Sequence, residues 1–171
     1  VGNGGGDTLS GGLGSDILMG GPGNDTYVFS ATATDEADTL FEGASGGIDT
    51  LDFTALTTDV VANLGSALVQ QVHLNRRIKL NNGQQFENLK GGSGNDILLG
   101  NSANNLLLGN AGNDQLSGGS GNDVLSGGIG NDTYLFRASP TPEVDTLLEG
   151  ANAGIDTLDF TALTTDVVAN L

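Results

Sequence analysis

The sequence predicts an all-β fold, a right-handed parallel β-roll (a β-solenoid) in which two nonapeptides, about 18 residues, make one coil. Three observations predict it: a nine-residue unit repeats without gaps, glycine stands at fixed positions in the unit, and one large apolar residue recurs in each copy. The unit reads G-G-x-G-x-D-x-U-x, where U is the apolar residue. Eight copies occur, at 2–10, 11–19, 20–28, 91–99, 100–108, 109–117, 118–126 and 127–135.

Each unit divides into a turn and a short strand. Glycine at positions one, two and four can adopt positive φ and allows close backbone approach, and asparagine at position five tolerates the left-handed region. The last three residues form a strand that points U inward and its neighbours outward. Coils then stack by parallel pairing. The expected inward residues are Leu9, Leu18, Tyr27, Leu98, Leu107, Leu116, Leu125 and Tyr134.

A longer repeat encloses the short one. Residues 29–64 match residues 136–171 at a constant offset of 107 (136 − 29), and the stretches 47–64 and 154–171 are identical. We interpret the chain as a piece of a tandem array. The expected organisation is a first β-roll block at 1–28, an irregular β-rich connecting region at 29–90 that continues the solenoid, a second β-roll block at 91–135, and a truncated copy of the connecting region at 136–171.

The charge balance restricts the partners. The chain has 21 acidic and 5 basic side chains, for a net charge of −16. This argues against nucleic acid, because phosphate binding needs clustered Lys and Arg. No apolar run is long enough to insert into a membrane, and without cysteine there can be neither a disulfide nor a thiolate metal site. A cation is the expected partner.

The apolar core predicted by the repeat is too thin to stabilise the fold. Each strand buries about one Leu, worth roughly 1.5–3 kcal/mol, whereas ordering the backbone costs on the order of 1–2 kcal/mol for each residue. Stacked turns also bring the position-six Asp of one coil to that of the next. Ca²⁺ held between them would turn repulsion into attraction, with glycine carbonyls completing about six oxygen ligands. Mg²⁺, zinc and copper fit this ligand set less well. Folding and the binding of several Ca²⁺ ions should then be one event.

The candidate ligands are the position-six carboxylates and the carbonyl groups of glycines in the same turns. We expect Asp7 to pair with Asp25, and Asp114 with both Asp96 and Asp132, along one edge of the solenoid. The other edge carries Asp16, Asn105 and Asp123, and its site at Asn105 should be weak or empty. The candidate carboxylates are Asp7, Asp16, Asp25, Asp96, Asp114, Asp123 and Asp132, and the candidate carbonyls are those of Gly2, Gly4, Gly11, Gly20, Gly91, Gly109, Gly118 and Gly127.

These repeats resemble the RTX family of hemolysin-type calcium-binding repeats. The stretch 46–136 also resembles the C-terminal module of serralysin-type metalloproteases, through GGIDTLDF and FENLKGGSGNDILLGNSANNLLLGNAGND. The resemblance implies a β-roll with Ca²⁺ between its turns, type I secretion, and a flanking calcium site formed by Asp49, Glu87 and the carbonyl of Gly47. Asp156 should resemble Asp49 by internal repetition. The resemblance does not include a protease domain, since the chain has no H-E-x-x-H motif.

We expect the chain not to be an enzyme. Residues 43–47 fit the G-x-S-x-G pattern, but that motif needs a strand before it and a helix after it, and Asn152 replaces Ser45 in the second copy. The expected function is a calcium-binding structural segment of a secreted protein, forming a calcium-rigidified extracellular rod such as an adhesin stalk, a surface layer or a filament. The alternative is the secretion and folding module of a type I-secreted enzyme whose catalytic domain lies outside this chain.

The expected partners beyond calcium are further copies of the same repeat unit, with self-assembly, and a cell-surface polysaccharide. Most of the positive charge lies at Arg76, Arg77, Lys79 and Lys90. We interpret this cluster as part of a solvated loop, with contact to an acidic surface as the alternative.

Overall fold

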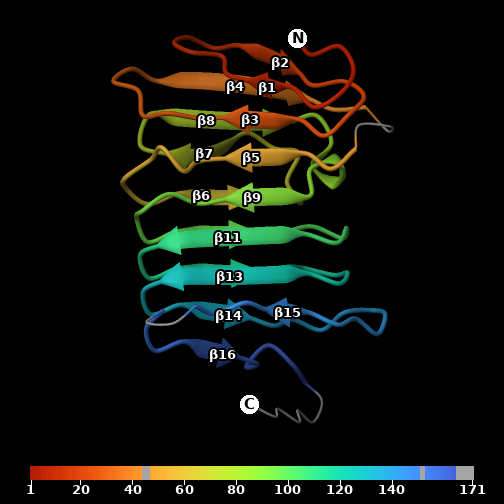
Figure 1. Ribbon diagram of the computed structural model, residues 1–171, viewed down its shortest axis with the longest axis vertical. Helices are drawn as coiled ribbons and strands as arrows, with labels where there is room; N and C mark the ends of the chain where they lie inside the picture. The colour runs from red at the N-terminus through yellow and green to blue at the C-terminus, as the bar shows by residue number, and fades with distance from the viewer. Residues whose placement is uncertain (44–46, 151–152, 165–171) are drawn as a thin grey trace.

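The computed structural model describes residues 1–43, 47–150 and 153–164. Within these ranges the protein is built almost entirely of short strands stacked into one solenoid, with β1 (Thr8–Leu9) near one end and β16 (Thr157–Asp159) at the other (Figure 1). The predicted all-β solenoid is therefore confirmed. No helix in the described ranges is long and apolar enough to cross a membrane. Ser45 and Asn152, which bear on the G-x-S-x-G pattern, lie outside the described residues, as do residues 165–171.

Seven parallel strands form a continuous sheet along one face of the solenoid, which we call the long sheet. Its strands, in spatial order, are β1 (Thr8–Leu9), β3 (Thr26–Val28), β5 (Thr50–Asp52), β9 (Asn88–Lys90), β11 (Leu106–Ala111), β13 (Val124–Ile129) and β15 (Thr146–Leu147).

Two shorter sheets form the opposite face. One contains β2 (Ile17–Met19), β4 (Glu36–Phe41), β8 (Arg76–Leu80) and β7 (Gln70–His73). The other contains β6 (Val61–Asn63), β10 (Ile97–Leu99), β12 (Gln115–Ser117), β14 (Thr133–Leu135) and β16 (Thr157–Asp159). The 3-10 helix η1 (Gly83–Gln85) lies between β8 and β9.

The strand register follows the nonapeptide period inside the blocks. Thr8 pairs with Thr26 and Leu106 with Val124, and in both pairs the partners are separated by two nonapeptides. Where the irregular region begins, the step lengthens: Ile17 pairs with Thr39 and Thr26 with Thr50. The additional residues lie in the connections and leave the pairing of the strands intact, so the same stacking continues beyond the regular repeats.

The irregular region contributes strands to the same sheets. Strands β5 and β9 lie between β3 and β11 in the long sheet. On the opposite face, β7 and β8 form an antiparallel hairpin whose second strand pairs with β4. The hairpin is joined to β6 through Gln70, whose side-chain carbonyl accepts the Asn63 N–H at 2.8 Å.

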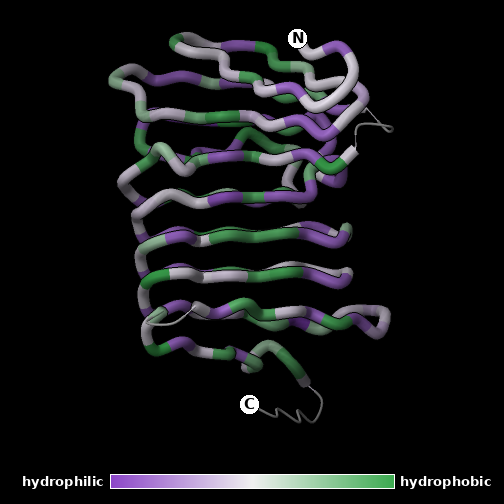
Figure 2. Tube along the Cα trace, viewed as in Figure 1, coloured by the Kyte–Doolittle hydropathy of each residue, from purple (hydrophilic) through white to green (hydrophobic). Residues whose placement is uncertain are grey.

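The core is a ladder of single apolar side chains between the two faces. All eight predicted inward residues are buried, as the alternation of side chains in a strand requires. Figure 2 shows the corresponding change between apolar and polar residues along the coils. Aromatic rings fill the ladder at the irregular region: Phe29 stacks on Phe53 with centroids 4.8 Å apart, and Tyr27 meets Phe86 edge-on at 5.7 Å.

Equivalent strands of the two copies of the longer repeat lie on opposite faces. Strand β3 belongs to the long sheet, whereas its counterpart β14 belongs to the opposite face. The same exchange relates β5 to β16, and β4 to β15. One long repeat unit therefore advances the solenoid by an odd number of half-coils.

Candidate metal centre

The position-six residues, continued by residues of the irregular regions, form a row along each edge of the solenoid. All of them directly precede a strand except Asp38, which lies inside β4. The row beside the long sheet is Asp7, Asp25, Asp49, Glu87, Asn105, Asp123 and Asp145. The row on the other edge is Asp16, Asp38, Val60, Asp96, Asp114, Asp132 and Asp156.

The structure corrects the predicted assignment of residues to edges. Asp7 and Asp25 share an edge with Asn105 and Asp123, whereas Asp96, Asp114 and Asp132 lie on the edge of Asp16. The prediction was wrong because it continued the alternation of turns across the irregular region. There the hairpin of β7 and β8 adds two strands to one face without a return to the other.

The predicted pairs themselves lie together. The backbone N–H of Asp7 donates to Oδ1 of Asp25 at 2.7 Å. The Asp96 N–H donates to Asp114, and the Asp114 N–H to Asp132, both at 2.7 Å. One oxygen of each carboxylate is therefore committed to the turn one coil before it. The same bond joins Asp16 to Asp38, Asp25 to Asp49, Asn105 to Asp123, Asp123 to Asp145 and Asp132 to Asp156.

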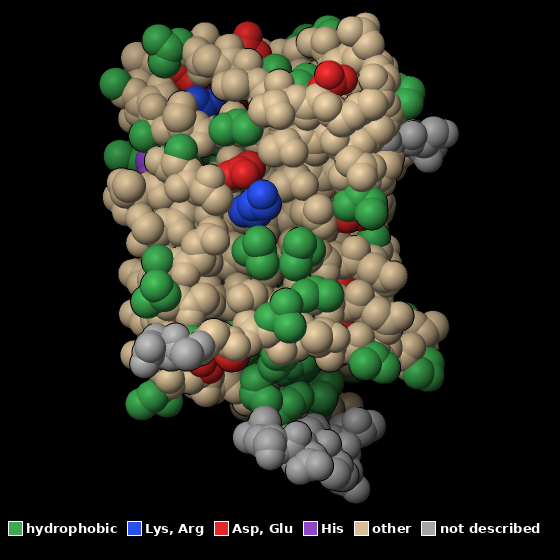
Figure 3. Space-filling model, in the orientation of Figure 1, with side chains coloured by type: hydrophobic (Ala, Val, Ile, Leu, Met, Phe, Trp, Pro, Cys, Tyr) green, Lys and Arg blue, Asp and Glu red, His purple; other side chains and the backbone are tan. Residues whose placement is uncertain are grey.

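The second carboxylate oxygen is the one available to a cation. Among the described residues it is buried and has no hydrogen-bond partner in six Asp side chains: Asp16, Asp25, Asp49, Asp114, Asp123 and Asp132. Such groups are rare in native proteins, because a buried charge without a partner is strongly unfavourable. In Figure 3 few carboxylates reach the visible surface, although the net charge is −16.

The position-one glycines leave room beside these oxygens. A methyl group on Gly109 would lie 2.2 Å from Oδ2 of Asp114 and 2.6 Å from the carbonyl oxygen of Gly127, one coil further on. These glycines do not have positive φ, whereas Gly119 (105°) and Gly121 (116°) in the next turn do. Position one therefore requires glycine because of space, and the space is lined by a carboxylate and a carbonyl. Oxygen ligands of these two kinds suit Ca²⁺.

Burial raises the pKa of several of these carboxyl groups. The pKa rises to about 7 for Asp114 and about 6 for Asp96 and Asp123, mainly through loss of solvation. Neighbouring carboxylates raise the pKa of Asp114 further, because Asp96 and Asp132 stack on it. The edge thus concentrates negative charge where water cannot screen it, which favours a bound cation.

The model of the RTX calcium-binding nonapeptide repeat family matches residues 1–31, 83–116 and 99–134. The chain carries RTX calcium-binding repeats. The matches follow the two blocks of regular nonapeptides and leave residues 32–82 and 135–171 unmatched. Curated proteins were also compared with the chain, and none matches it. The RTX repeats imply that the chain binds Ca²⁺, and the orphaned carboxylate oxygens beside glycine carbonyls fit that ion.

At two positions in the rows of edge residues, a side chain of the protein itself supplies the polar contact. Oδ2 of Asp38 accepts a bond from Nη1 of Arg76 at 2.6 Å, and Nη2 of Arg76 bonds Glu36 at 2.9 Å, with all three side chains buried. At Asn105, Nδ2 donates to the Glu87 carbonyl at 3.0 Å. The guanidinium of Arg76 at the first position and the amide of Asn105 at the second thus supply polar contacts within the protein itself.

Burial of Arg76 also changes the interpretation of the basic cluster. Its guanidinium faces the interior above the Phe29 ring, so a solvated loop is the wrong description for this residue. Lys90 and Arg77 are nearer the surface, but each lies beside a carboxylate, Asp52 at 3.5 Å and Asp35 at 3.4 Å.

The residues of the implied flanking site meet at the start of β5 and β9. The backbone N–H of Asp49 donates to Oε2 of Glu87 at 2.8 Å, and the Asp49 carbonyl accepts the Glu87 N–H at 3.1 Å. Gly47 has a φ of 132° and packs against the Gly23 carbonyl. The structure therefore brings Asp49 and Glu87 together, and metal ligation by this group stays a prediction.

Sequence reasoning missed Glu42. Carboxylate oxygens of Asp25, Glu42 and Asp49 all lie within 4.8 Å of one another, and all three residues are buried. The available signal was repetition, because Glu149 occupies the same place in the second copy of the unit.

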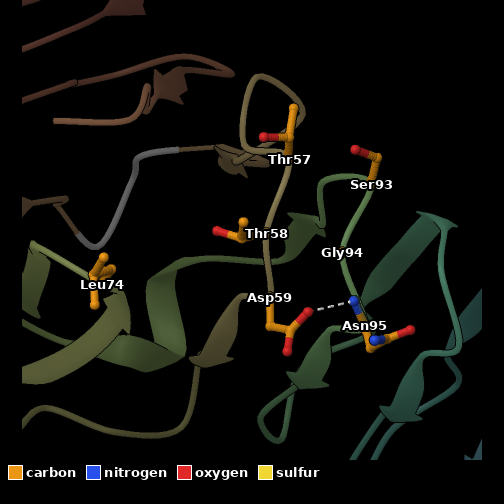
Figure 4. Close-up of a pocket in the computed structure, with 7 residues that line it drawn as sticks. All are labelled: Thr57, Thr58, Asp59, Leu74, Ser93, Gly94 and Asn95. Atoms are coloured by element: carbon orange, nitrogen blue, oxygen red, sulfur yellow. Dashed lines mark hydrogen bonds between the residues drawn. The ribbon is translucent and has the colours of Figure 1, made fainter.

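A surface hollow lies between the turns that precede β6 and β10. Figure 4 shows its lining: Thr57, Thr58, Asp59, Leu74, Ser93, Gly94 and Asn95. The Asp59 carboxylate accepts the Asn95 N–H at 2.8 Å, so it serves to connect the two turns. None of the six Asp side chains with a buried, unpartnered oxygen lines this hollow. We therefore place the candidate site at the edges of the solenoid.

Proposed function

We propose that this chain is a calcium-binding structural segment of a secreted tandem-repeat protein, in which ions between the stacked turns stiffen an extracellular rod. The observation that carries the proposal is the row of buried, unpartnered carboxylate oxygens, repeated from coil to coil beside glycine carbonyls. Charge of one sign that is buried and repeated in this way requires a counter-ion.

Coupling between folding and calcium follows from this arrangement. The apolar ladder is one side chain wide, and the stacked carboxylates oppose its formation unless a cation joins them. Calcium binding therefore contributes directly to the folding free energy. A chain of this kind would remain unfolded in a low-calcium cytosol, pass through a type I secretion system, and fold outside the cell.

The way in which a solenoid lengthens supports the proposed rod. A solenoid lengthens along its axis without changing its cross-section, and the chain contains one long repeat unit with a second, partial copy. Further copies of the unit are thus the first expected partners, followed by a cell-surface polysaccharide. The proposed role is structural and not enzymatic. The resemblance of residues 46–136 to a serralysin-type module favours the second candidate, a secretion and folding module of an enzyme.

Circular dichroism with a calcium titration tests the proposal. We expect cooperative gain of β-structure on adding Ca²⁺, its loss on chelation, and little effect of Mg²⁺ at the same concentration. Small-angle scattering of two joined units should then give a maximum dimension that grows in proportion to length. A β-fold that persists unchanged in chelator would reject calcium-coupled folding, and a compact calcium-loaded particle would reject the rod.

A further inference from the structure

Glu42 stands where the regular pattern would place a position-one glycine. Strand β4 pairs with β2 so that Met19 lies opposite Phe41, and the residues that follow these two are Gly20 and Glu42. The Glu42 side chain turns back toward Gly20, where an added methyl group would meet its Oε1. The carboxylate therefore lies in the space that the other coils leave open.

Tyr27 holds this carboxylate in place. The ring is fully buried, its hydroxyl accepts the Gly20 N–H at 2.8 Å, and it donates to Oε1 of Glu42. A tyrosine hydroxyl keeps its proton at neutral pH, so it serves as a donor to the carboxylate. Glu42 is thus oriented by a fixed neutral group, which does not cancel its charge.

Two further carboxylates converge on the same place. Oδ2 of Asp25 and Oδ2 of Asp49 are buried without a hydrogen-bond partner, and these residues are 1% and 0% exposed. In the described part of the chain, no Lys or Arg forms an ion pair with either Asp25 or Asp49.

We propose that Asp25, Glu42 and Asp49 form a divalent-cation site of a second kind, with three carboxylates where a regular RTX step has two. This inference rests on the proposed function, since it assumes that cations join the turns. The ligands are all hard oxygens, which selects Ca²⁺ over transition metals. Because the number of charged ligands tunes calcium affinity, this site fills before the regular steps.

The contacts of the tyrosine recur in the second copy of the unit. The Gly127 N–H donates to the Tyr134 hydroxyl at 2.7 Å, and this hydroxyl donates to Glu149. The Asp132 N–H donates to Asp156 at 2.9 Å, and Oδ2 of Asp132 has no partner. The second copy thus repeats the tyrosine–glutamate contact and the Asp–Asp bond, whereas among the described residues only the first group has three carboxylate oxygens within 4.8 Å of one another. The proposal extends to Asp132, Glu149 and Asp156 as the equivalent residues.

Tyrosine provides a probe specific to these sites. The chain has two tyrosines and no tryptophan, and both hydroxyls contact the glutamates in question. Tb³⁺, which replaces Ca²⁺ at oxygen sites, luminesces when it receives energy from a nearby excited tyrosine. A titration of the whole chain with Tb³⁺, excited at tyrosine, therefore reports the two proposed sites above all others.

We expect Tyr27→Phe to remove the luminescence of the first site and Tyr134→Phe that of the second. In the Tyr134→Phe background, Glu42→Gln should weaken Tb³⁺ and competing Ca²⁺ at the first site at least tenfold. Asp35→Asn is the matched control, because it removes one charge from an exposed side chain and should leave the titration unchanged.

Failure of the three-carboxylate site and failure of the proposed function give different results. Calcium-dependent folding with a titration that Glu42→Gln does not change would overturn the three-carboxylate site and leave the proposed function standing. Absence of both calcium-dependent folding and Tb³⁺ binding would overturn both. If Glu42→Gln does not fold in saturating calcium, Glu149→Gln in the Tyr27→Phe background makes the same measurement at the second site.

Discussion

Replacing Asp114 with Asn separates the role of metal ligand from that of turn former. The Asp114 side chain is 1% exposed. Its Oδ1 accepts the Asp96 N–H and its own N–H donates to Asp132, both at 2.7 Å. An Asn side chain keeps a carbonyl oxygen that can accept the Asp96 N–H, and Asn105, at an equivalent position, keeps the bond from its own N–H to the next carboxylate. The substitution therefore changes the charge and leaves the turn in place.

The expected effect changes sign with calcium. Burial and the stacked carboxylates raise the pKa of Asp114 from 3.8 to about 7. At pH 8 the calcium-free fold carries this charge at a cost of about 4 kcal/mol, so removing it stabilises that fold by up to that amount. In saturating calcium the same change replaces a charged ligand with a neutral one, and should destabilise the fold by about 3–5 kcal/mol.

Chemical unfolding followed by circular dichroism checks both signs. One pair of curves is measured in saturating Ca²⁺ and another in chelator, with trimethylamine N-oxide added to bring the calcium-free proteins into a measurable range. Opposite shifts of the midpoint are expected. Shifts of the same sign in both media would mean that Asp114 only forms the turn. That result would refute the argument that a cation joins the stacked carboxylates.

The edges support three further predictions. In chelator, the free energy of unfolding should rise as the pH falls from 8 toward 5. The reason is that carboxyl groups with pKa values of about 6 to 7 take up protons in the folded state before the unfolded chain does. A denaturant midpoint that falls with acid would contradict this. Gly118→Ala places a methyl group 1.9 Å from Oδ2 of Asp123 and should raise the calcium concentration needed for folding about tenfold or more, whereas Gly43→Ala, which meets open space, should not. Arg76→Met leaves buried acids without their cation and should lower stability by about 3–5 kcal/mol with or without calcium, so a loss in chelator alone would argue against a metal-independent role.

The regular blocks were predictable because the residues that determine each turn and each strand lie within the same nonapeptide. Gly and Asn specify the turn, the single apolar residue specifies the direction of the strand, and the two-unit period fixes which carboxylates meet. Leu107 and Leu116 are buried as expected, and Asp96 lies against Asp114 as expected.

The remainder depends on contacts that no local pattern encodes. The edge assignment required the path of the hairpin of β7 and β8, which has no repeat. Arg76 bonds Asp38 from a distant part of the sequence, and nothing in the spacing identifies that pair. Glu42 was missed because the regular repeat has glycine at its position. Its significance appears only when strands β2 and β4 are placed in register.

The exchange of faces between the two copies has a consequence for any longer array of these units. An odd number of half-coils relates successive copies by a half-turn screw about the long axis. The hairpin of β7 and β8, with the exposed side chains of Val69 and Leu74, would then project from alternate sides. A surface lying along one flank would meet every second copy only, and two surfaces on opposite flanks could be bridged by the same molecule.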